Sequence, residues 1–407
     1  MRALLRAWLV SGFVLPCVAQ AETHEFTAMA DLRAVAVDSP YTSFTEGGLG
    51  LLRYDEAHDG LRLGSLMLDI TGPLSETIRY TATAYATGDG DRHLLDLTEA
   101  YLEWRPYPKH ALRWRTRVGA FYPTLSLENR NVGWQSPYSI SASAINSWIG
   151  EEFRIIGAET SVTLAGAPGG RGFDVSLFGS VYGWNDPAGI LIFQRGWAIH
   201  DRQTPLFGHL PRPFPGNDGV NDMEFFDEVD GRAGYYAGAD IKWTAGHAVR
   251  ALHYDNRGDV SQTDAREPAW LTRFDSIGVR LELPADLTFI AQYLDGTTGV
   301  RPSADGRGAA IAEYWSWFGL LSYRSGNHRF TARHDRMATY TIRGEQYFEG
   351  EQNAHAWTAA YLFDVNAHWQ IAAEVIRITG TLEQRTYLGQ PVDAKEIQAQ
   401  LAVRFMF

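Results

Sequence analysis

The last dozen residues of the chain alternate between an apolar face and a mainly polar face. Positions 397, 399, 401, 403, 405 and 407 are all apolar, whereas the other face carries Glu396, Gln398, Gln400, Ala402, Arg404 and Met406. A period of two predicts a β-strand with one apolar face and one hydrated face. Such a terminal strand is typical of a barrel that has lipid outside and water inside.

The same alternation recurs along the chain in segments of about ten to thirteen residues. Counted back from the last strand, all the long connections fall on one side, as expected for short periplasmic turns and long external loops. The candidate strands cover residues 26–37, 45–54, 61–70, 76–87, 95–105, 111–122, 153–164, 172–182, 231–243, 247–255, 271–283, 287–295, 312–323, 328–338, 354–363, 369–378 and 396–407.

These candidates number about 17, whereas single-chain bacterial barrels have even strand numbers. Either one candidate near the N-terminus is wrong, or the long connection at 183–230 holds an irregular feature. We therefore predict an all-β fold, an antiparallel up-and-down transmembrane barrel of 16 strands, with 18 as the alternative.

The N-terminus carries a targeting pattern. Arg2 and Arg6 precede an apolar stretch that ends in Ala19-Gln20-Ala21. This pattern predicts a secretory signal peptide over residues 1–21, which leaves one barrel domain over residues 22–407. Cys17, the only cysteine, lies inside the signal without a lipobox before it, so we expect a mature chain without thiol or disulfide chemistry.

Composition and charge narrow the class further. After the signal no run of about 20 apolar residues occurs, so the sequence predicts no transmembrane helix. A net charge of −12 argues against nucleic-acid binding. The 12 histidines show no metal-ligand spacing, and we predict no metal and no cofactor. The acidic stretch 218–230 does not match a calcium loop and is interpreted as a solvated loop. The alternative is a site for a divalent cation or for the cation layer that bridges surface lipopolysaccharide.

The connection at 123–152 combines polar residues with many large apolar ones. A loop of this composition tends to pack against something. We predict that it folds into the lumen and narrows the pore, because a barrel of this size is too wide for wall side chains to fill. The alternative is an external loop that packs on itself or on a neighbouring subunit. The candidate constriction residues are Glu128, Asn129, Arg130, Trp134, Tyr138 and Trp148.

Three arginines form the most distinctive local pattern. Arg113, Arg115 and Arg117 alternate with apolar residues, so they share one strand face. Charge on the lipid face near the midplane would cost ~2–4 kcal/mol each, which places these arginines in the lumen. There they either attract anions or pair with glutamates of neighbouring strands, Glu159 among them, and only solvate the wall. The candidate pore-lining residues are Arg113, Arg115, Arg117, Arg154, Arg329, Arg333, Glu99 and Glu103.

Signal peptide, strand pattern, inward loop and terminal Phe407 together resemble bacterial outer-membrane porins. Gly119-Ala120-Phe121-Tyr122-Pro123 leading to Glu128 is also similar to a segment of the phosphate-selective porin superfamily. The resemblance implies an outer-membrane location and passive diffusion of small hydrophilic solutes, with an anion preference. It further implies a homotrimer, contact with outer-membrane lipid and lipopolysaccharide, and recognition of the last strand by the barrel-assembly machinery.

Two other classes stay open. A transporter of hydrophobic compounds would explain the apolar residues of the second long connection, which could equally be a subunit contact: Ile190, Leu191, Ile192, Phe193, Trp197 and Ile199. An outer-membrane hydrolase would need a catalytic set such as His253 with Asp255 or His334 with Asp335. No nucleophile is fixed beside either pair, so we predict that the protein is not an enzyme.

Overall fold

A computed structural model describes residues 24–89, 95–214, 221–263, 268–300, 310–343 and 350–407, so the predicted signal peptide lies outside the described residues. Two α-helices are described, α2 (Ala144–Glu152) and α3 (Ile190–Arg195). Among the described helices, none is long and apolar enough to cross a membrane. The strands are β1 (Glu25–Asp38), β2 (Gly60–Pro73), β3 (Ile78–Ala86), β4 (Asp96–Trp104), β5 (Leu112–Phe121), β6 (Ile155–Leu164), β7 (Phe173–Gly183), β8 (His209–Pro211), β9 (Asp222–Glu224), β10 (Gly234–Trp243), β11 (Ala248–Asp255), β12 (Leu271–Leu283), β13 (Leu287–Val300), β14 (Ala310–Ser325), β15 (His328–Arg343), β16 (Gln352–Asp364), β17 (Trp369–Leu382) and β18 (Asp393–Met406).

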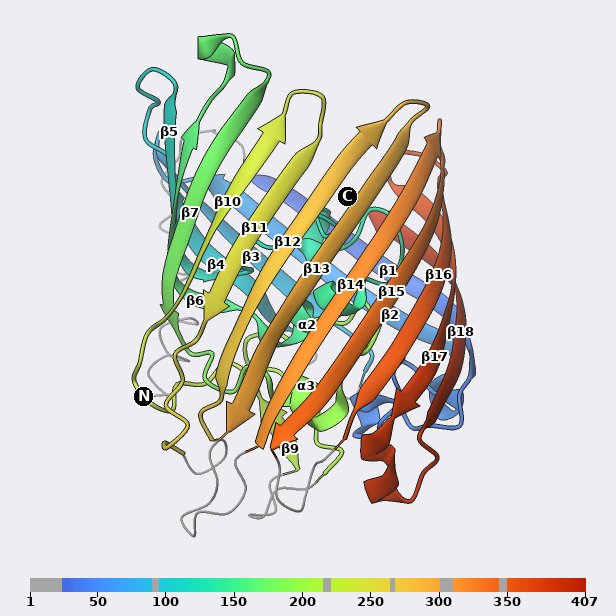
Figure 1. Cartoon of the computed structure of the whole chain (residues 1–407). Helices are drawn as coiled ribbons and strands as arrows, with labels where there is room; N and C mark the ends of the chain where they lie inside the picture. The colour runs from blue at the N-terminus through green and yellow to red at the C-terminus, as the bar shows by residue number, and fades with distance from the viewer. Residues whose placement is uncertain (1–23, 90–94, 215–220, 264–267, 301–309, 344–349) are drawn as a thin grey trace.

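Within the described residues, 16 of these strands form one closed antiparallel barrel (Figure 1). Each strand pairs with its sequence neighbour in the barrel, and the seam closes where β1 meets β18, with Met29 opposite Met406. Phe407 adds two backbone hydrogen bonds to Ala28 across this seam. The predicted fold class and strand number are confirmed.

The candidate strand at 45–54 is wrong. Residues 39–59 form a loop with two 3-10 turns, η1 (Phe44–Glu46) and η2 (Glu56–His58). Ser43 caps η1, and Gly47 follows in the left-handed region at φ 77°, a conformation that favours glycine and interrupts a strand. The long connection after β7 is also irregular, since β8 and β9 form a separate two-stranded sheet outside the barrel order.

The alternation of side chains sorts the barrel wall into two faces. On β18 Leu401 and Val403 are exposed outward, whereas Glu396, Gln400 and Arg404 on the opposite face are buried in the interior. Large tryptophans also project outward: Trp104, Trp114, Trp243 and Trp369 lie near strand ends, whereas Trp317 and Trp357 lie nearer the middle of β14 and β16. An apolar outward band edged by aromatic residues is the surface that a membrane barrel presents to lipid.

The two ends of the barrel differ in their connections. At the end that holds both Glu25 and Met406, consecutive strands are joined by short turns such as 284–286 and 326–327. At the opposite end the long connections gather, as predicted. By the usual asymmetry of these barrels, the short-turn end is periplasmic and the long-loop end external.

Three long connections fold back into the barrel. We call them inner loop 1 (residues 39–59), inner loop 2 (122–154, with α2) and inner loop 3 (184–214 and 221–233, with α3). Their backbones hydrogen-bond to inward side chains of the wall: Leu51 to Glu396, Ile140 to Glu374, and Trp197 to Gln352. Figure 1 shows α2 and α3 inside the ring of strands.

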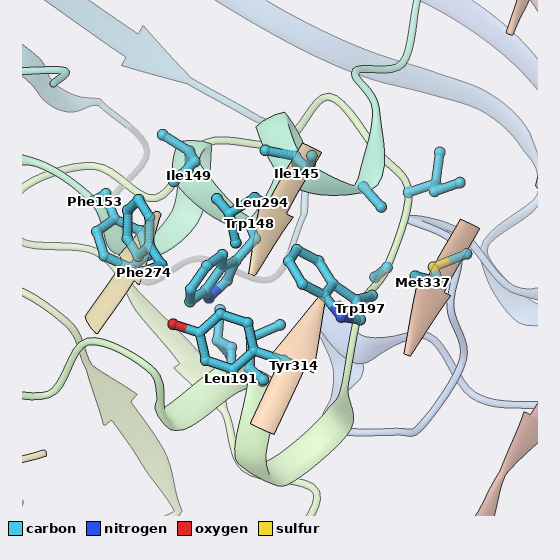
Figure 2. Packing of buried hydrophobic residues seen from close by; sticks show 14 of the residues in the cluster. Ile145, Trp148, Ile149, Phe153, Leu191, Trp197, Phe274, Leu294, Tyr314 and Met337 are labelled. Carbon is cyan, nitrogen blue, oxygen red and sulfur yellow. The ribbon is translucent and has the colours of Figure 1, made fainter. Parts of the chain in front are cut away.

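A large apolar cluster joins inner loops 2 and 3 to the wall (Figure 2). Trp148 of α2 makes edge contacts with Trp197 of inner loop 3 at 5.3 Å and with Tyr314 of β14 at 5.1 Å between ring centroids. Phe153 contacts Phe274 of β12 in the same way at 5.3 Å. This side of the barrel interior is therefore packed like the core of a soluble protein.

Candidate functional site

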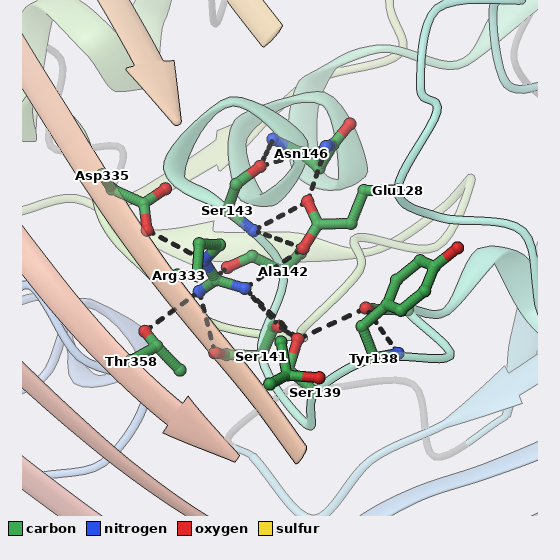
Figure 3. Close-up of polar contacts among 12 residues, drawn as sticks. Glu128, Tyr138, Ser139, Ser141, Ala142, Ser143, Asn146, Arg333, Asp335 and Thr358 are labelled. Atoms are coloured by element: carbon green, nitrogen blue, oxygen red, sulfur yellow. Dashed lines mark hydrogen bonds and ion pairs between the residues drawn. The ribbon is translucent and has the colours of Figure 1, made fainter. Parts of the chain in front are cut away.

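Glu128 anchors the middle of inner loop 2 (Figure 3). Its carboxylate accepts hydrogen bonds from the backbone N–H of Ser143 at 3.1 and 3.2 Å and from Asn146 Nδ2 at 2.8 Å. Ser143 in turn caps the N-terminus of α2. The fully buried carboxylate therefore fixes where α2 begins.

Arg333 of β15 binds this loop to the opposite wall. Its guanidinium pairs with Glu128 at 3.1 Å and Asp335 at 2.8 Å, and it donates to the carbonyl oxygens of Ser141 at 2.9 Å and Ala142 at 2.7 Å. Arg333 faces the interior, as its register predicts, but it is fully buried beneath inner loop 2. It therefore holds the loop in place and does not line a water-filled passage.

The arginine column of β5 faces the interior, but two of its members are paired. Arg117 and Arg115 share Glu159 of β6 at 2.8 and 3.1 Å, and Glu103 lies 3.9 Å from Arg115. Among the described residues Arg113, near the periplasmic end, makes no ion pair and is exposed. The alternative interpretation, pairing with wall glutamates, thus describes two of the three arginines.

The other candidate wall residues have different surroundings. Glu99 accepts a hydrogen bond from the backbone N–H of Tyr122 at 3.0 Å. Arg154 is fully buried over the ring of Tyr122, 3.7 Å from its centroid, rather than facing water. Arg329 donates to Ser322 at 3.1 Å and lies 5.1 Å from the ring centre of Tyr138.

The remaining constriction candidates divide between the packed and the polar side of inner loop 2. Trp148 lies in the apolar cluster, whereas Trp134 stacks on Tyr122 at 4.2 Å and its carbonyl accepts from Asn129 at 2.9 Å. Arg130 is exposed.

A second set of charges was not predicted. Asp201 of inner loop 3 pairs with Arg33 of β1 and with Arg53 of inner loop 1, each at 2.8 Å, and Arg53 also pairs with Asp89 at 2.7 Å. Burial alone would raise the pKa of Asp201, but the two guanidinium groups hold it well below its usual range. No local pattern marks these residues, because Asp201 and its two arginine partners come together only when two loops enter the barrel.

A narrow polar gap of about 10 Å³ separates inner loops 2 and 3, which is about the space of one water molecule. Four buried atoms in its lining have no hydrogen-bond partner within the described structure: Asn129 Oδ1, Gln135 Nε2, Asn146 Oδ1 and His200 Nδ1. Unpaired buried polar atoms are costly unless water or a solute reaches them.

Asp186, Glu228 and Asp230 bring carboxylate oxygens within 4.8 Å of one another. Burial is the main cause that raises the pKa of Asp186 to about 7, and the two neighbouring carboxylates add to it. The backbone N–H groups of Val229 and Asp230 donate to Asp186 at 2.6 and 3.1 Å. These bonds hold the buried Asp186 against the end of the acidic stretch, where Glu228 and Asp230 are only partly buried.

No protein-family model matches the sequence, and no curated protein does. Solved structures do match. The outer membrane channel DcaP of Acinetobacter baumannii has a TM-score of 0.56 at 11% identity, covering 95% of this chain and 97% of that one. The trimer form of OmpT, an outer membrane protein of Vibrio cholerae, has a TM-score of 0.53 at 9% identity, covering 95% and 99%. An anion-selective porin from Comamonas acidovorans has a TM-score of 0.50 at 11% identity, again covering 95% and 99%.

The chain thus has the fold of bacterial outer-membrane porins over nearly its whole length. The predicted resemblance is confirmed at the level of the fold. The outward apolar band fits the predicted location in the bacterial outer membrane.

Proposed function

We propose that the protein is an outer-membrane channel for the passive diffusion of small hydrophilic solutes through a narrowed lumen. The observation that carries this proposal is inner loop 2, which crosses a wide closed barrel and is fixed to the far wall through Arg333 and Glu374. A barrel wall of this size needs such a segment to set the width of its passage.

The narrow part of the passage is the polar gap between inner loops 2 and 3. Its lining offers both acceptors, such as Asn146 Oδ1, and a donor, Gln135 Nε2. Solutes that carry hydroxyl or amide groups can exchange their water for these atoms. In the conformation described, the gap favours water-sized solutes and small ions.

Charge selectivity in this proposal is a mild anion preference carried by unpaired arginines. Arg113 and Arg329 face the interior without an ion pair among the described residues, whereas Arg115 and Arg117 are compensated by Glu159. The anion-selective porin with this fold is consistent with such a preference. The trimer form of OmpT supports a homotrimer as the assembly.

A planar-bilayer recording of the purified, folded protein tests the channel. We expect small unitary currents that grow when Gln135→Ala widens the gap, and a reversal potential under a KCl gradient that favours chloride. Replacing Arg113 and Arg329 with Gln should shift that potential toward potassium. Arg171→Gln, at an exposed arginine of a short turn, is the matched control. An absence of current from folded protein would reject the channel, and an unchanged reversal potential would reject the role of the two arginines.

The two alternative functions, transport of hydrophobic compounds and hydrolysis, lose their structural support. The apolar residues of the second long connection, Leu191 and Trp197 among them, are buried in the interior cluster and form neither an external binding surface nor a subunit contact. His334 and Asp335 lie on opposite faces of β15, because Asp335 binds Arg333 inside while His334 contacts the outward Trp357. In the other candidate pair of the hydrolase alternative, His253 with Asp255, the histidine hydrogen-bonds to Asp275 instead, at 2.9 Å.

A further inference from the structure

His200 connects inner loops 2 and 3 at the edge of the polar gap. Its carbonyl oxygen accepts hydrogen bonds from the backbone N–H of Ala142 at 3.0 Å and from Ser147 Oγ at 2.9 Å. Its own backbone N–H donates to Ser147 Oγ at 3.0 Å. The residue is buried and lines the gap. We call these contacts, together with the contact between His200 and Glu151 of α2, the His200 joint.

The two ring nitrogens of His200 have different surroundings. Nε2 lies 3.1 Å from the Glu151 carboxylate. Burial alone would raise the pKa of Glu151, but Arg195 and its other cationic neighbours lower it to about 2. An ionised carboxylate can only accept, so Nε2 carries the proton and Nδ1 has a bare lone pair. Nδ1 has no hydrogen-bond partner within the described structure, and the joint therefore holds a neutral imidazole.

The carboxylates near His200 already have cationic partners. Glu151 pairs with Arg195 and lies 3.8 Å from Arg202. Asp201, the next residue in the chain, is held by the arginines of β1 and inner loop 1. A second proton on His200 would make it the third cation around one buried carboxylate. Like charges at such short range repel one another, so the joint disfavours an imidazolium.

Burial adds to this effect. Desolvation lowers the pKa of His200 below its usual value, Glu151 and Asp201 act in the opposite direction, and Arg195 acts in the same direction. Inner loop 1 offers no charge to the ring, because the contact there is Phe44, at 4.7 Å between ring centroids. When water reaches Nδ1, the pKa returns toward about 6.5. The joint is thus fully stable above that pH and loses stability as the pH falls below it.

Both sides of the joint are anchored to the barrel wall by other contacts. Next to His200, Asp201 is paired with β1, and inner loop 2 is paired with Arg333 of β15. Release of the joint therefore separates the two loops without detaching either from the wall. Water that enters the gap can then bond to Oδ1 of Asn129 and Asn146, which have no partner within the described structure. Pairing these buried acceptors lowers the cost of opening.

We propose that the His200 joint is a pH-sensitive gate: a proton on Nδ1 separates inner loop 3 from α2 and widens the polar gap in acid. The effect on transport rests on the proposed channel function, whereas the separation of the loops does not. Passage through the barrel is then narrow at neutral pH and wider below about pH 6, because the proton is bound more tightly by the open arrangement.

Planar-bilayer recordings and hydrogen exchange of the purified full-length barrel test the proposal together. Between pH 7.5 and pH 5 we expect the mean conductance of the wild type to rise about threefold. Exchange in residues 139–148 and 198–204, corrected for its intrinsic pH dependence, should rise over the same range. His200→Gln keeps a donor for Glu151 but has no titrating nitrogen, so both responses should be absent. His200→Lys carries a permanent charge and should behave at pH 7.5 as the wild type does in acid.

The matched control is His328→Gln, at an exposed histidine beside a periplasmic turn, which should keep both responses to acid. Resistance of the barrel to heat in a denaturing gel verifies that each variant is folded. An acid response that persists in folded His200→Gln, or a wild type in which neither measurement changes with pH, would overturn the proposal. Exchange that rises in acid through His200 while no current flows at any pH would support the gate and reject the channel instead.

Discussion

Arg33 and Asp201 stand 168 positions apart in the sequence and form a two-pronged ion pair inside the barrel, with N–O distances of 2.8 and 3.2 Å. Arg33 belongs to β1 at the seam, and Asp201 belongs to inner loop 3. Arg53 of inner loop 1 also donates a hydrogen bond to the Asp201 carboxylate, at 2.8 Å. One carboxylate thereby connects two inner loops to the wall.

Replacing Asp201 with Asn should loosen inner loop 3. The change leaves two buried guanidinium groups without their shared counterion, and loss of one partner of a buried pair costs about 3–5 kcal/mol. We expect faster hydrogen exchange in residues 195–204 and larger, noisier single-channel currents. Asp259→Asn removes a loop ion pair in which Arg232 is half exposed, and it should change neither measurement. Unaltered exchange in Asp201→Asn would show that the apolar cluster alone holds the loop.

Arg333→Gln should release inner loop 2 from β15. The buried guanidinium bonds to two carboxylates and two carbonyl oxygens, so the variant should cut the loop's resistance to proteolysis at 123–143. A double-mutant cycle with Glu128→Gln measures the coupling, which we expect at about 1–3 kcal/mol. Additive effects of the two changes would mean that each side chain acts through other partners.

The contact between α2 and α3 should weaken at alkaline pH. Burial raises the pKa of Glu152 to about 8, although Leu191 and Gly189 donate backbone hydrogen bonds to its carboxylate. Because the folded pKa lies above the unfolded value, this group's contribution to stability is fully present at low pH and is lost as pH rises through about 8. Trp148 donates to the same carboxylate, so tryptophan fluorescence between pH 6 and 10 should report the change. In Glu152→Gln the transition should be absent, and its persistence would assign it to another group.

Two outward leucines should differ in their tolerance of charge. Leu32 lies near the middle of β1, and Leu61 lies at the external end of β2; both are exposed on the outer wall. Leu32→Arg should destabilise the folded barrel by about 2–4 kcal/mol, whereas Leu61→Arg should cost about 0–1 kcal/mol because it reaches the headgroups. Urea titration in lipid vesicles measures both values. Equal costs would place the apolar band at another height.

The sequence predicted features that depend on local alternation and missed those that depend on long-range folding. The period of two placed Arg113, Arg115 and Arg117 on the inward face, because a strand fixes side-chain direction residue by residue. The segment 45–54 was mistaken for a strand, since its apolar residues pack inside the barrel as a loop.

The partners of the interior charges could not be predicted in the same way. Whether Arg333 meets water or Glu128 is decided by the path of a loop 205 positions away. Similarly, the apolar residues around Leu191 gave no indication of whether they face a ligand, a subunit or the chain itself. They are buried because the wall side chains do not fill a barrel of this width, so that a loop can occupy the remaining space.

The seam between β1 and β18 also constrains the order of folding. The wall becomes continuous only when Met29 meets Met406, yet Asp201 must already be inside to reach Arg33 on the strand that closes the ring. Threading a bulky, charged loop into a finished cylinder would be slow, and loop closure over such sequence distances is itself a kinetic barrier. We therefore expect the inner loops and the barrel wall to fold in one cooperative step. A defect in either should then leave an open β-sheet rather than a closed barrel without its inner loops.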